Sequence, residues 1–273
     1  MTTDTLDTAT ITVDALGEPL ALECFEAGSG DPLLLLHGAS GFRASDPYVA
    51  ALAERHRVIA PSHPGYGATP RPEWLDTVTD LAHFHLELLE QRDLRDVTIV
   101  GLSLGGWIAA EMAAWRSERI ARLVLIDPVG IRVGGPTDRD IVDIFAISAE
   151  ERARRVFHDP AYAGPPPAEL PSEELVRRLR AEETTALYAW EPYMCNPKLR
   201  RRLRAVRVPA LVVWGEHDGI APVGYGHAYA ESFPDARFEV VAAAGHSPHV
   251  EQPATVVELI ERFLSETSSG AAA

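Results

Sequence analysis

The chain has 273 residues, of which 46% are hydrophobic and 24% are charged, and its formal net charge is −15 at pH 7. This length is enough to bury a sizeable core and suits one α/β domain with an insertion. Because binding to a phosphate backbone needs a basic face, the acidic balance argues against nucleic acid as a partner. No apolar run approaches the roughly 18–20 residues that cross a bilayer, so no membrane partner is expected.

The N-terminal residues indicate the compartment, and the cysteines and one basic stretch are also informative. Residues 1–14 are acidic and polar and lack the basic and apolar parts of a signal peptide, so we expect a cytoplasmic protein. Cys24 and Cys195 lie far apart, in no metal or redox spacing, which predicts free, buried thiols. The basic stretch 198–207 is interpreted as a solvated helix face or a clamp between domains, with an anion-facing patch as the alternative.

Eight segments have the hydrophobic pattern of strands. Two of them flank a turn at Gly17, and the continuous apolar run at 32–38 is typical of a strand buried on both faces of a parallel sheet. Together the predicted strands are 10–14, 20–26, 32–38, 56–62, 97–103, 122–127, 210–215 and 238–245. Helical patterns lie between them at 46–55, 77–92, 104–116, 223–232 and 253–266. This alternation predicts an α/β fold with a mainly parallel, doubly wound central sheet flanked by helices.

The alternation of strands and helices stops between 131 and 205. This stretch is rich in Arg and Glu and contains no buried-strand pattern, and amphipathic helices at 149–157 and 172–188 fit it best. We therefore predict a core domain made of 1–130 and 206–266, and a helical cap inserted between core strands at 131–205. The small, polar residues 267–273 are expected to form a disordered tail.

One serine stands where a buried-strand pattern changes into a helical one. Ser103 lies between Gly101 and Gly105. A sharp strand-to-helix turn brings backbone segments close together and therefore needs small flanking residues. The first N–H groups of the new helix also favour a developing negative charge beside the serine. The pattern predicts an exposed nucleophile, although a serine that only caps the helix would fit the same residues.

A serine nucleophile needs a base, and the base needs an acid that orients it. His246 and Asp218 each follow a later strand pattern, so both are expected with Ser103 at the carboxyl edge of the sheet. The chain order Ser103, Asp218, His246 is the order expected for this architecture.

Other residues compete for these roles. His249 is an alternative base, and Asp127 and Glu216 are alternative acids. His217 and His63 are interpreted as supporting or surface residues.

Attack on a carbonyl also requires donors for the oxyanion. The stretch 33–41 ends a predicted central strand with His-Gly. We expect the backbone N–H groups of Ala39 and Leu104 to bracket the carbonyl oxygen, although a glycine turn without a role would also explain the stretch.

Four motifs together resemble the α/β-hydrolase family along nearly the whole core. "HGASG" resembles its HGxxG oxyanion loop, "GLSLGG" its GxSxG nucleophile elbow, and "WGEHDGIAP" and "AGHSPHVEQP" its acid and histidine loops. The insertion corresponds in position to the family's cap. In "SHPGYGAT", Ser62 stands where the family commonly has Asp, and Thr69 where it has Ser. That loop is structural in the family, so the departure is not expected to affect catalysis.

The residues and the resemblance imply a serine hydrolase that needs no cofactor or metal ion and cleaves a carboxylic ester or lactone of a small hydrophobic substrate through an acyl-enzyme. Serine at position 103 argues against the dehalogenase and epoxide-hydrolase branches, which attack with a carboxylate. Three alternatives remain: a carbon–carbon bond (diketone) hydrolase, a perhydrolase, and a non-hydrolytic ligand-binding, lyase or cyclase member of the fold. A monomer or homodimer is expected.

The substrate pocket is expected to be mostly apolar and to lie between the core and the cap. Tyr66 and Cys195 are among its candidates, and the aromatic residues of the cap would serve equally as the cap's own small core. The principal candidates are His37, Ser40, Phe42, Trp107, Trp190, Tyr193 and Met194.

Overall fold

An eight-stranded sheet forms the centre of the computed structural model, which describes residues 8–135 and 137–268. Its strands stand in the order β1-β2-β4-β3-β5-β6-β7-β8. The pairs β1–β2 and β2–β4 are antiparallel, and the remaining pairs are parallel, which confirms the predicted sheet. The strands are β1 (Thr8–Ala15), β2 (Glu18–Ala27), β3 (Pro32–Leu36), β4 (Arg57–Pro61), β5 (Val97–Leu102), β6 (Ile120–Ile126), β7 (Ala210–Gly215) and β8 (Ala236–Val241).

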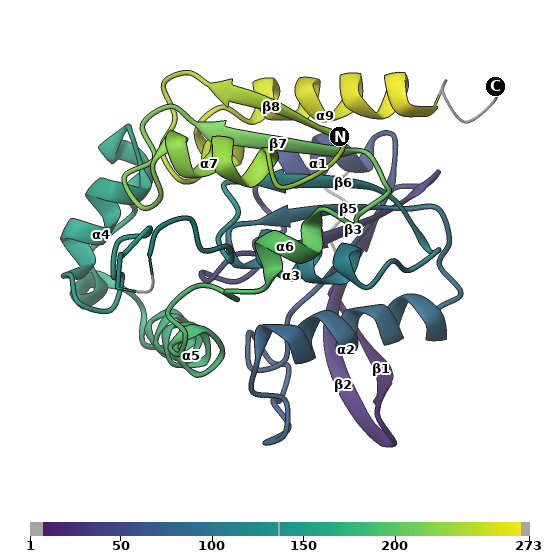
Figure 1. Ribbon diagram of the computed structural model, residues 1–273. Coiled ribbons are helices and arrows are strands. Elements are labelled where there is room, and N and C mark those ends of the chain that lie inside the picture. The colour runs from purple at the N-terminus through teal and green to yellow at the C-terminus, as the bar shows by residue number, and fades with distance from the viewer. Residues whose placement is uncertain (1–7, 136, 269–273) are drawn as a thin grey trace.

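Helices cover both faces of the sheet (Figure 1). On one face α2 (Val78–Gln91), α3 (Leu104–Ala114) and α7 (Val223–Ala230) pack into one apolar cluster. On the other, α1 (Pro47–Ala53) and α9 (Pro253–Ser268) form a second cluster. Because the central strands are covered twice, every residue of β5 and β7 is buried, which explains their continuous apolar sequence.

The segment 131–205 leaves the core between β6 and β7 and contains three α-helices, α4 (Ala149–Val156), α5 (Ser172–Ala189) and the short α6 (Leu199–Leu203). The two helices predicted here are present as α4 and α5. Both lie beyond the end of the sheet toward which the parallel strands point, at the left in Figure 1. We refer to residues 131–205 as the inserted segment.

The basic stretch 198–207 joins the inserted segment to the core. Leu199 and Leu203 of α6 are fully buried, and Arg202 places its guanidinium 3.7 Å from the buried carboxylate of Glu111 on α3. Asn196 donates a hydrogen bond of 2.7 Å to the same carboxylate. These contacts agree with a clamp between the two parts of the chain.

Three smaller expectations concern the cysteines, the tail and membrane spans. Cys24 and Cys195 are free and buried as predicted, and burial raises the pKa of the Cys24 thiol to about 12. Helix α9 continues to Ser268, two residues into the stretch expected to be disordered, and 269–273 lie outside the described residues. Among the described helices, none combines the length and apolarity needed to cross a bilayer.

Candidate active site

Ser103 occupies the tight turn between β5 and α3. Its backbone has φ +50° and ψ −109°, a strained conformation for a residue with a side chain. The turn is held because the Ser103 N–H donates to the carbonyl of Ile126 at 2.9 Å. A Cβ at Gly101 would lie 2.5 Å from the Gly105 oxygen, and one at Gly105 would lie 2.1 Å from the Leu36 oxygen. Both glycines are therefore required, as the sequence predicted.

The structure brings Ser103, His246 and Asp218 together in one hydrogen-bonded chain. Ser103 Oγ lies 2.8 Å from His246 Nε2, and His246 Nδ1 lies 2.7 Å from Asp218 Oδ2. The backbone N–H groups of Ile220 and Ala221 donate to the other Asp218 oxygen at 2.7 and 3.0 Å. The Asp218 carboxylate is an acceptor, which assigns the proton to His246 Nδ1 and leaves Nε2 free to accept from Ser103.

Two of the competing residues, His249 and Glu216, lie outside this hydrogen-bonded chain. His249, within the histidine loop, is partly buried with its ring 5.0 Å from that of Tyr48, and desolvation of the ring lowers its pKa to about 3. Glu216 is half exposed, and the ring of its neighbour His217 stacks on His158 at 4.2 Å. Neither His249 nor Glu216 is bonded to the Ser103–His246 pair. Asp127, the other alternative acid, is buried beside Asp218 and is taken up below.

The loop after β3 passes directly over the serine. A Cβ built on Gly38 would lie 3.4 Å from Ser103 Cβ, so the next peptide, that of Ala39, begins within a few ångströms of the nucleophile. The N–H of Leu104 belongs to the first turn of α3, where N–H groups have no partner within the helix. Over the described parts of the chain, neither N–H donates to a protein acceptor. Both N–H groups are therefore free to donate to a bound ligand, and their role as oxyanion donors stays a prediction.

Three buried histidines, His37, His63 and His85, lie on the interior side of this loop and support it. The His63 N–H donates to His37 Nε2, and the His63 ring donates from Nε2 to the His37 carbonyl, both at 3.0 Å. His63 Nδ1 then accepts from His85 Nε2 at 2.8 Å, which leaves the buried His85 Nδ1 without a partner. All three rings are consequently neutral. His37 supports the loop from inside rather than lining a pocket, and of the two places expected for His63 the fully buried ring takes the supporting one.

The histidine cluster makes the free energy of unfolding depend on pH. Burial lowers the pKa of His37 to about 4 and of His85 to about 3, from an ordinary value of 6.5. Between these values the unfolded chain binds protons that the folded protein does not, so the free energy of unfolding should fall from about pH 6.5 to about pH 4, by up to about 1.4 kcal/mol per pH unit per histidine. Urea titrations across this range should show a shallower fall for His85→Leu. An equal slope in wild type and variant would contradict the prediction.

The loop that departs from the family pattern is held by a carboxylate from another strand. Glu23 of β2 accepts from the Ser62 hydroxyl at 3.3 Å and from the Ala68 N–H at 3.0 Å. Its own N–H donates to the Thr69 hydroxyl at 3.0 Å. Glu23 thus brings a carboxylate to a loop in which Ser62 stands where the family commonly has Asp. Glu23 was not predicted, because nothing local to β2 indicates this contact.

The end of α4 is bonded to the loops that contain Asp218 and His246. The carbonyl of Arg155 accepts from the Gly219 N–H at 3.0 Å, and that of Val156 accepts from the His246 N–H at 2.7 Å. The buried Glu251 joins the same parts, because its oxygens accept from the N–H groups of Asp159 and Gly245 at 2.8 and 2.6 Å. Glu251 was not predicted, and its only signal was its place in the quoted histidine loop. The inserted segment therefore helps to fix the positions of Asp218 and His246.

Helix α5 is bonded to the two loops on the other side of the serine. Thr184 donates to the Gly65 carbonyl, and Tyr188 donates to the Pro64 carbonyl, both at 3.0 Å. Thr185 donates to its own helix at Ala181 and lies 3.5 Å from the Ala39 carbonyl oxygen. The oxyanion loop is thus held between the histidine cluster and the inserted segment.

The predicted pocket residues are spread over several environments. Trp107 and Met194 are buried, and the indole N–H of Trp107 donates to Glu111 at 3.3 Å. Tyr193 donates to the Val142 carbonyl at 2.7 Å, which ties it into the inserted segment. Of the other candidates, Phe42 packs on Phe25 with ring centroids 5.4 Å apart, Tyr66 bonds to Thr185, Cys195 is buried, Trp190 is 56% exposed and Ser40 is exposed.

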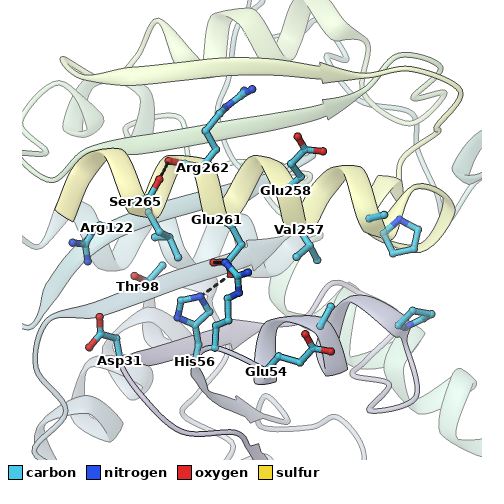
Figure 2. A pocket seen from close by; sticks show the side chains of 16 residues that line it. Asp31, Glu54, His56, Thr98, Arg122, Val257, Glu258, Glu261, Arg262 and Ser265 are labelled. Atoms are coloured by element: carbon cyan, nitrogen blue, oxygen red, sulfur yellow. Dashed lines mark hydrogen bonds and ion pairs between the residues drawn. The ribbon is translucent and has the colours of Figure 1, made fainter. Parts of the chain in front are cut away.

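A separate groove of about 1010 Å³ runs between α1 and α9 (Figure 2). Asp31, Thr98 and Arg122, which lie at or near the beginnings of β3, β5 and β6, contribute to its floor. His56 and Glu261 bridge it with a hydrogen bond of 2.8 Å (Figure 2). Since Ser103 follows the carboxyl end of β5, the groove lies toward the opposite edge of the sheet and is not part of the candidate active site.

Among the described residues, one group of acidic and histidine side chains is close enough to hold a metal ion: Asp127, Asp218 and His246, with one atom of each within 4.8 Å of the others. Both ring nitrogens of His246 already have protein partners in the chain from Ser103 to Asp218. The geometry therefore suits proton transfer better than metal binding.

Comparison with known proteins identifies the family. The model of the alpha/beta hydrolase family matches residues 33–259, and the chain belongs to that family. A 2-hydroxymuconate semialdehyde hydrolase of Pseudomonas sp. is 27% identical, over 90% of this chain and 91% of its own length. An uncharacterized protein of Mycobacterium tuberculosis is 28% identical, over 88% of this chain and 77% of its own.

The fold is also found among solved structures. The crystal structure of a membrane phospholipase A, described as a bacterial virulence factor, superposes with a TM-score of 0.79 at 22% identity, covering 96% of this chain and 87% of that one. This likeness establishes the shared fold. The family and the named relative together assign the chain to the hydrolases.

Proposed function

We propose that the protein is a serine hydrolase that cleaves a carboxylic ester or lactone through an acyl-enzyme formed on Ser103. The observation that carries the proposal is the continuous hydrogen-bonded chain from Ser103 through His246 to Asp218, with distances of 2.8 and 2.7 Å. Such a chain activates a hydroxyl whose ordinary form is a poor nucleophile.

The steps follow from the assigned protons. His246 Nε2 takes the proton of the Ser103 hydroxyl as the oxygen attacks the substrate carbonyl. Asp218 stabilises the imidazolium that forms and keeps the ring in the reactive tautomer. The N–H groups of Ala39 and Leu104 stabilise the oxyanion, and each such donor is typically worth about 3–4 kcal/mol of the barrier. His246 then protonates the leaving group and activates the water that releases the acyl group.

The inserted segment acts as a cap in this proposal. Helix α5 bonds to the loop 62–69 and contacts the oxyanion loop at the Ala39 carbonyl. The end of α4 bonds to the acid and histidine loops, so a substrate that reaches Ser103 would be enclosed between core and cap. Trp107 of α3 and Met194 of the inserted segment are both apolar and buried, and a pocket lined by such side chains would favour a small hydrophobic acyl group.

A second candidate is hydrolysis of a carbon–carbon bond next to a carbonyl. The relative that is 27% identical over 90% of this chain is a 2-hydroxymuconate semialdehyde hydrolase, a name that implies such a reaction. The same three side chains and oxyanion donors would serve it, so the choice between ester and carbon–carbon cleavage depends on the substrate and not on the triad.

The test is covalent labelling followed by a substrate panel. A small alkyl fluorophosphonate should add once to the wild-type protein and not to Ser103→Ala, as read from intact masses. Aliphatic esters, lactones and vinylogous diketones should then be compared by kcat/KM. Absence of an adduct on folded wild-type protein would overturn the proposal, and faster cleavage of diketones than of any ester would replace it with the second candidate.

A further inference from the structure

Asp127 is a buried acid with an oxygen that has no partner. It follows the last residue of β6, with none of its surface exposed. Its backbone is held at φ +44° by a hydrogen bond of 2.9 Å from its N–H to the Val213 carbonyl. Its Oδ1 accepts from the Gly215 N–H at 2.9 Å, whereas its Oδ2 is buried and unpaired.

The carboxyl of Asp127 lies beside the acid–base pair of the candidate site. One oxygen of Asp127, one of Asp218 and one nitrogen of His246 all lie within 4.8 Å of one another. Two acids this close in a buried position cannot both carry a charge without a large electrostatic cost. One of them must therefore hold a proton.

The hydrogen bonds decide which acid keeps its charge. Asp218 accepts from two backbone N–H groups and faces the His246 ring, all of which favour a carboxylate. Asp127 receives only one N–H, and the other charged groups that face it, Asp218 and Glu251, are negative. Burial and these neighbours raise the pKa of Asp127 well above its ordinary value. The unpaired Oδ2 of Asp127 is the atom that would carry this proton.

We propose that Asp127 is a second acid of this site: it carries a proton beside Asp218 in the resting protein, and it becomes the carboxylate that supports His246 when Asp218 is neutralised. In the resting state it is a positioning residue, whose O–H faces the Asp218 carboxylate. The inference rests on the proposed function only for its kinetic part. No oxidant or co-reactant is needed, because a single proton leaves Asp127 for solvent.

If this is so, the effect of Asp127→Asn on the labelling rate of Ser103 should depend strongly on whether Asp218 is also replaced. Asp127→Asn replaces a neutral acid with a neutral amide of the same shape, so it should slow labelling far less in the wild-type background than in the Asp218→Asn background. In Asp218→Asn the neighbouring negative charge is gone, the pKa of Asp127 falls, and its carboxylate faces His246. We expect this variant to react about 10- to 100-fold slower than wild type. Asp127→Asn/Asp218→Asn has no carboxylate beside His246 and should lose about 10⁴-fold.

Two measurements test the inference independently. The first is the rate of phosphonylation of Ser103 by an alkyl fluorophosphonate, measured from about pH 5 to about pH 9 in wild type, both single variants and the double variant. In the plot of rate against pH, only Asp218→Asn should show a second ionisation on the acidic side, because Asp127 must lose its proton before it can support His246. The second is an infrared difference spectrum between wild type and Asp127→Asn, which should contain the C=O band of one protonated carboxyl group.

The outcomes are distinct. If Asp127→Asn slows Asp218→Asn no more than it slows wild type, Asp127 is not a second acid, and if the protonated band is missing, its proton assignment is wrong. If wild type does not react with the fluorophosphonate at all, the proposed function fails, whereas the infrared measurement still decides whether Asp127 holds a proton. Thermal unfolding of each variant excludes loss of fold as the cause.

Discussion

Replacing His246 with alanine is expected to lower kcat for the best substrate of the panel by about 10⁴- to 10⁶-fold, with little change in the melting temperature. His246 Nε2 is the acceptor 2.8 Å from the Ser103 hydroxyl, and its ring is 9% exposed. Without it, the serine keeps its proton and the leaving group has no acid. The loss should appear in kcat rather than in KM, because His246 acts on the transition state.

The histidine loop itself contains the matched control. His249 lies three residues further on, is partly buried and packs edge-on against Tyr48. His249→Leu should therefore keep kcat within tenfold of wild type. The assignment of the base would have to be reversed if His249→Leu were inactive while His246→Ala retained turnover.

Substituting Gly105 with alanine is expected to reduce the free energy of unfolding by about 3 kcal/mol or more. The added Cβ would lie 2.1 Å from the Leu36 oxygen and 2.6 Å from the His37 oxygen. Both are backbone atoms of β3 and of the loop that follows it, so they cannot rotate away. The protein should relieve the clash by moving α3 away from β3, which also moves Ser103, and urea unfolding should report the loss.

Gly224 is the control for this substitution, because it is likewise the second residue of its helix, α7, but a Cβ there would meet nothing within 4 Å. Gly224→Ala should raise the free energy of unfolding by up to about 1 kcal/mol, since alanine favours the helix over glycine. Equal effects of the two substitutions would show that the close contact between α3 and β3 is not what requires Gly105.

Much of this architecture is readable from local sequence because periodicity and burial are coupled. A strand covered on both faces has to be apolar throughout, and all six residues of β5 and of β7 are both apolar or small and buried. The order of the candidate residues follows from the same principle, since each comes after a strand whose carboxyl end lies at the same edge of the sheet. Their assembly into a hydrogen-bonded chain then depends on the loops.

Contacts between distant segments could not be read in this way. Glu23 stabilises the loop 62–69 from β2, Glu251 joins the histidine loop to the end of α4, and His85 reaches His63 from α2. In each case the partners are far apart along the chain, and the local sequence around either residue does not predict the contact. His37 was expected at the pocket. It is instead the first residue after β3, and its ring is buried under the loop.

The sequence by itself determined the parallel sheet, the small residues around Ser103 and the strand ends at which His246 and Asp218 stand, because these depend on backbone geometry and apolar periodicity. Only the tertiary structure decided that the ring of His249 packs against Tyr48 and that Asp127 shares its surroundings with Asp218. The protonation of an acid depends on which charges and donors approach it from other segments, and that information exists only once the chain has folded.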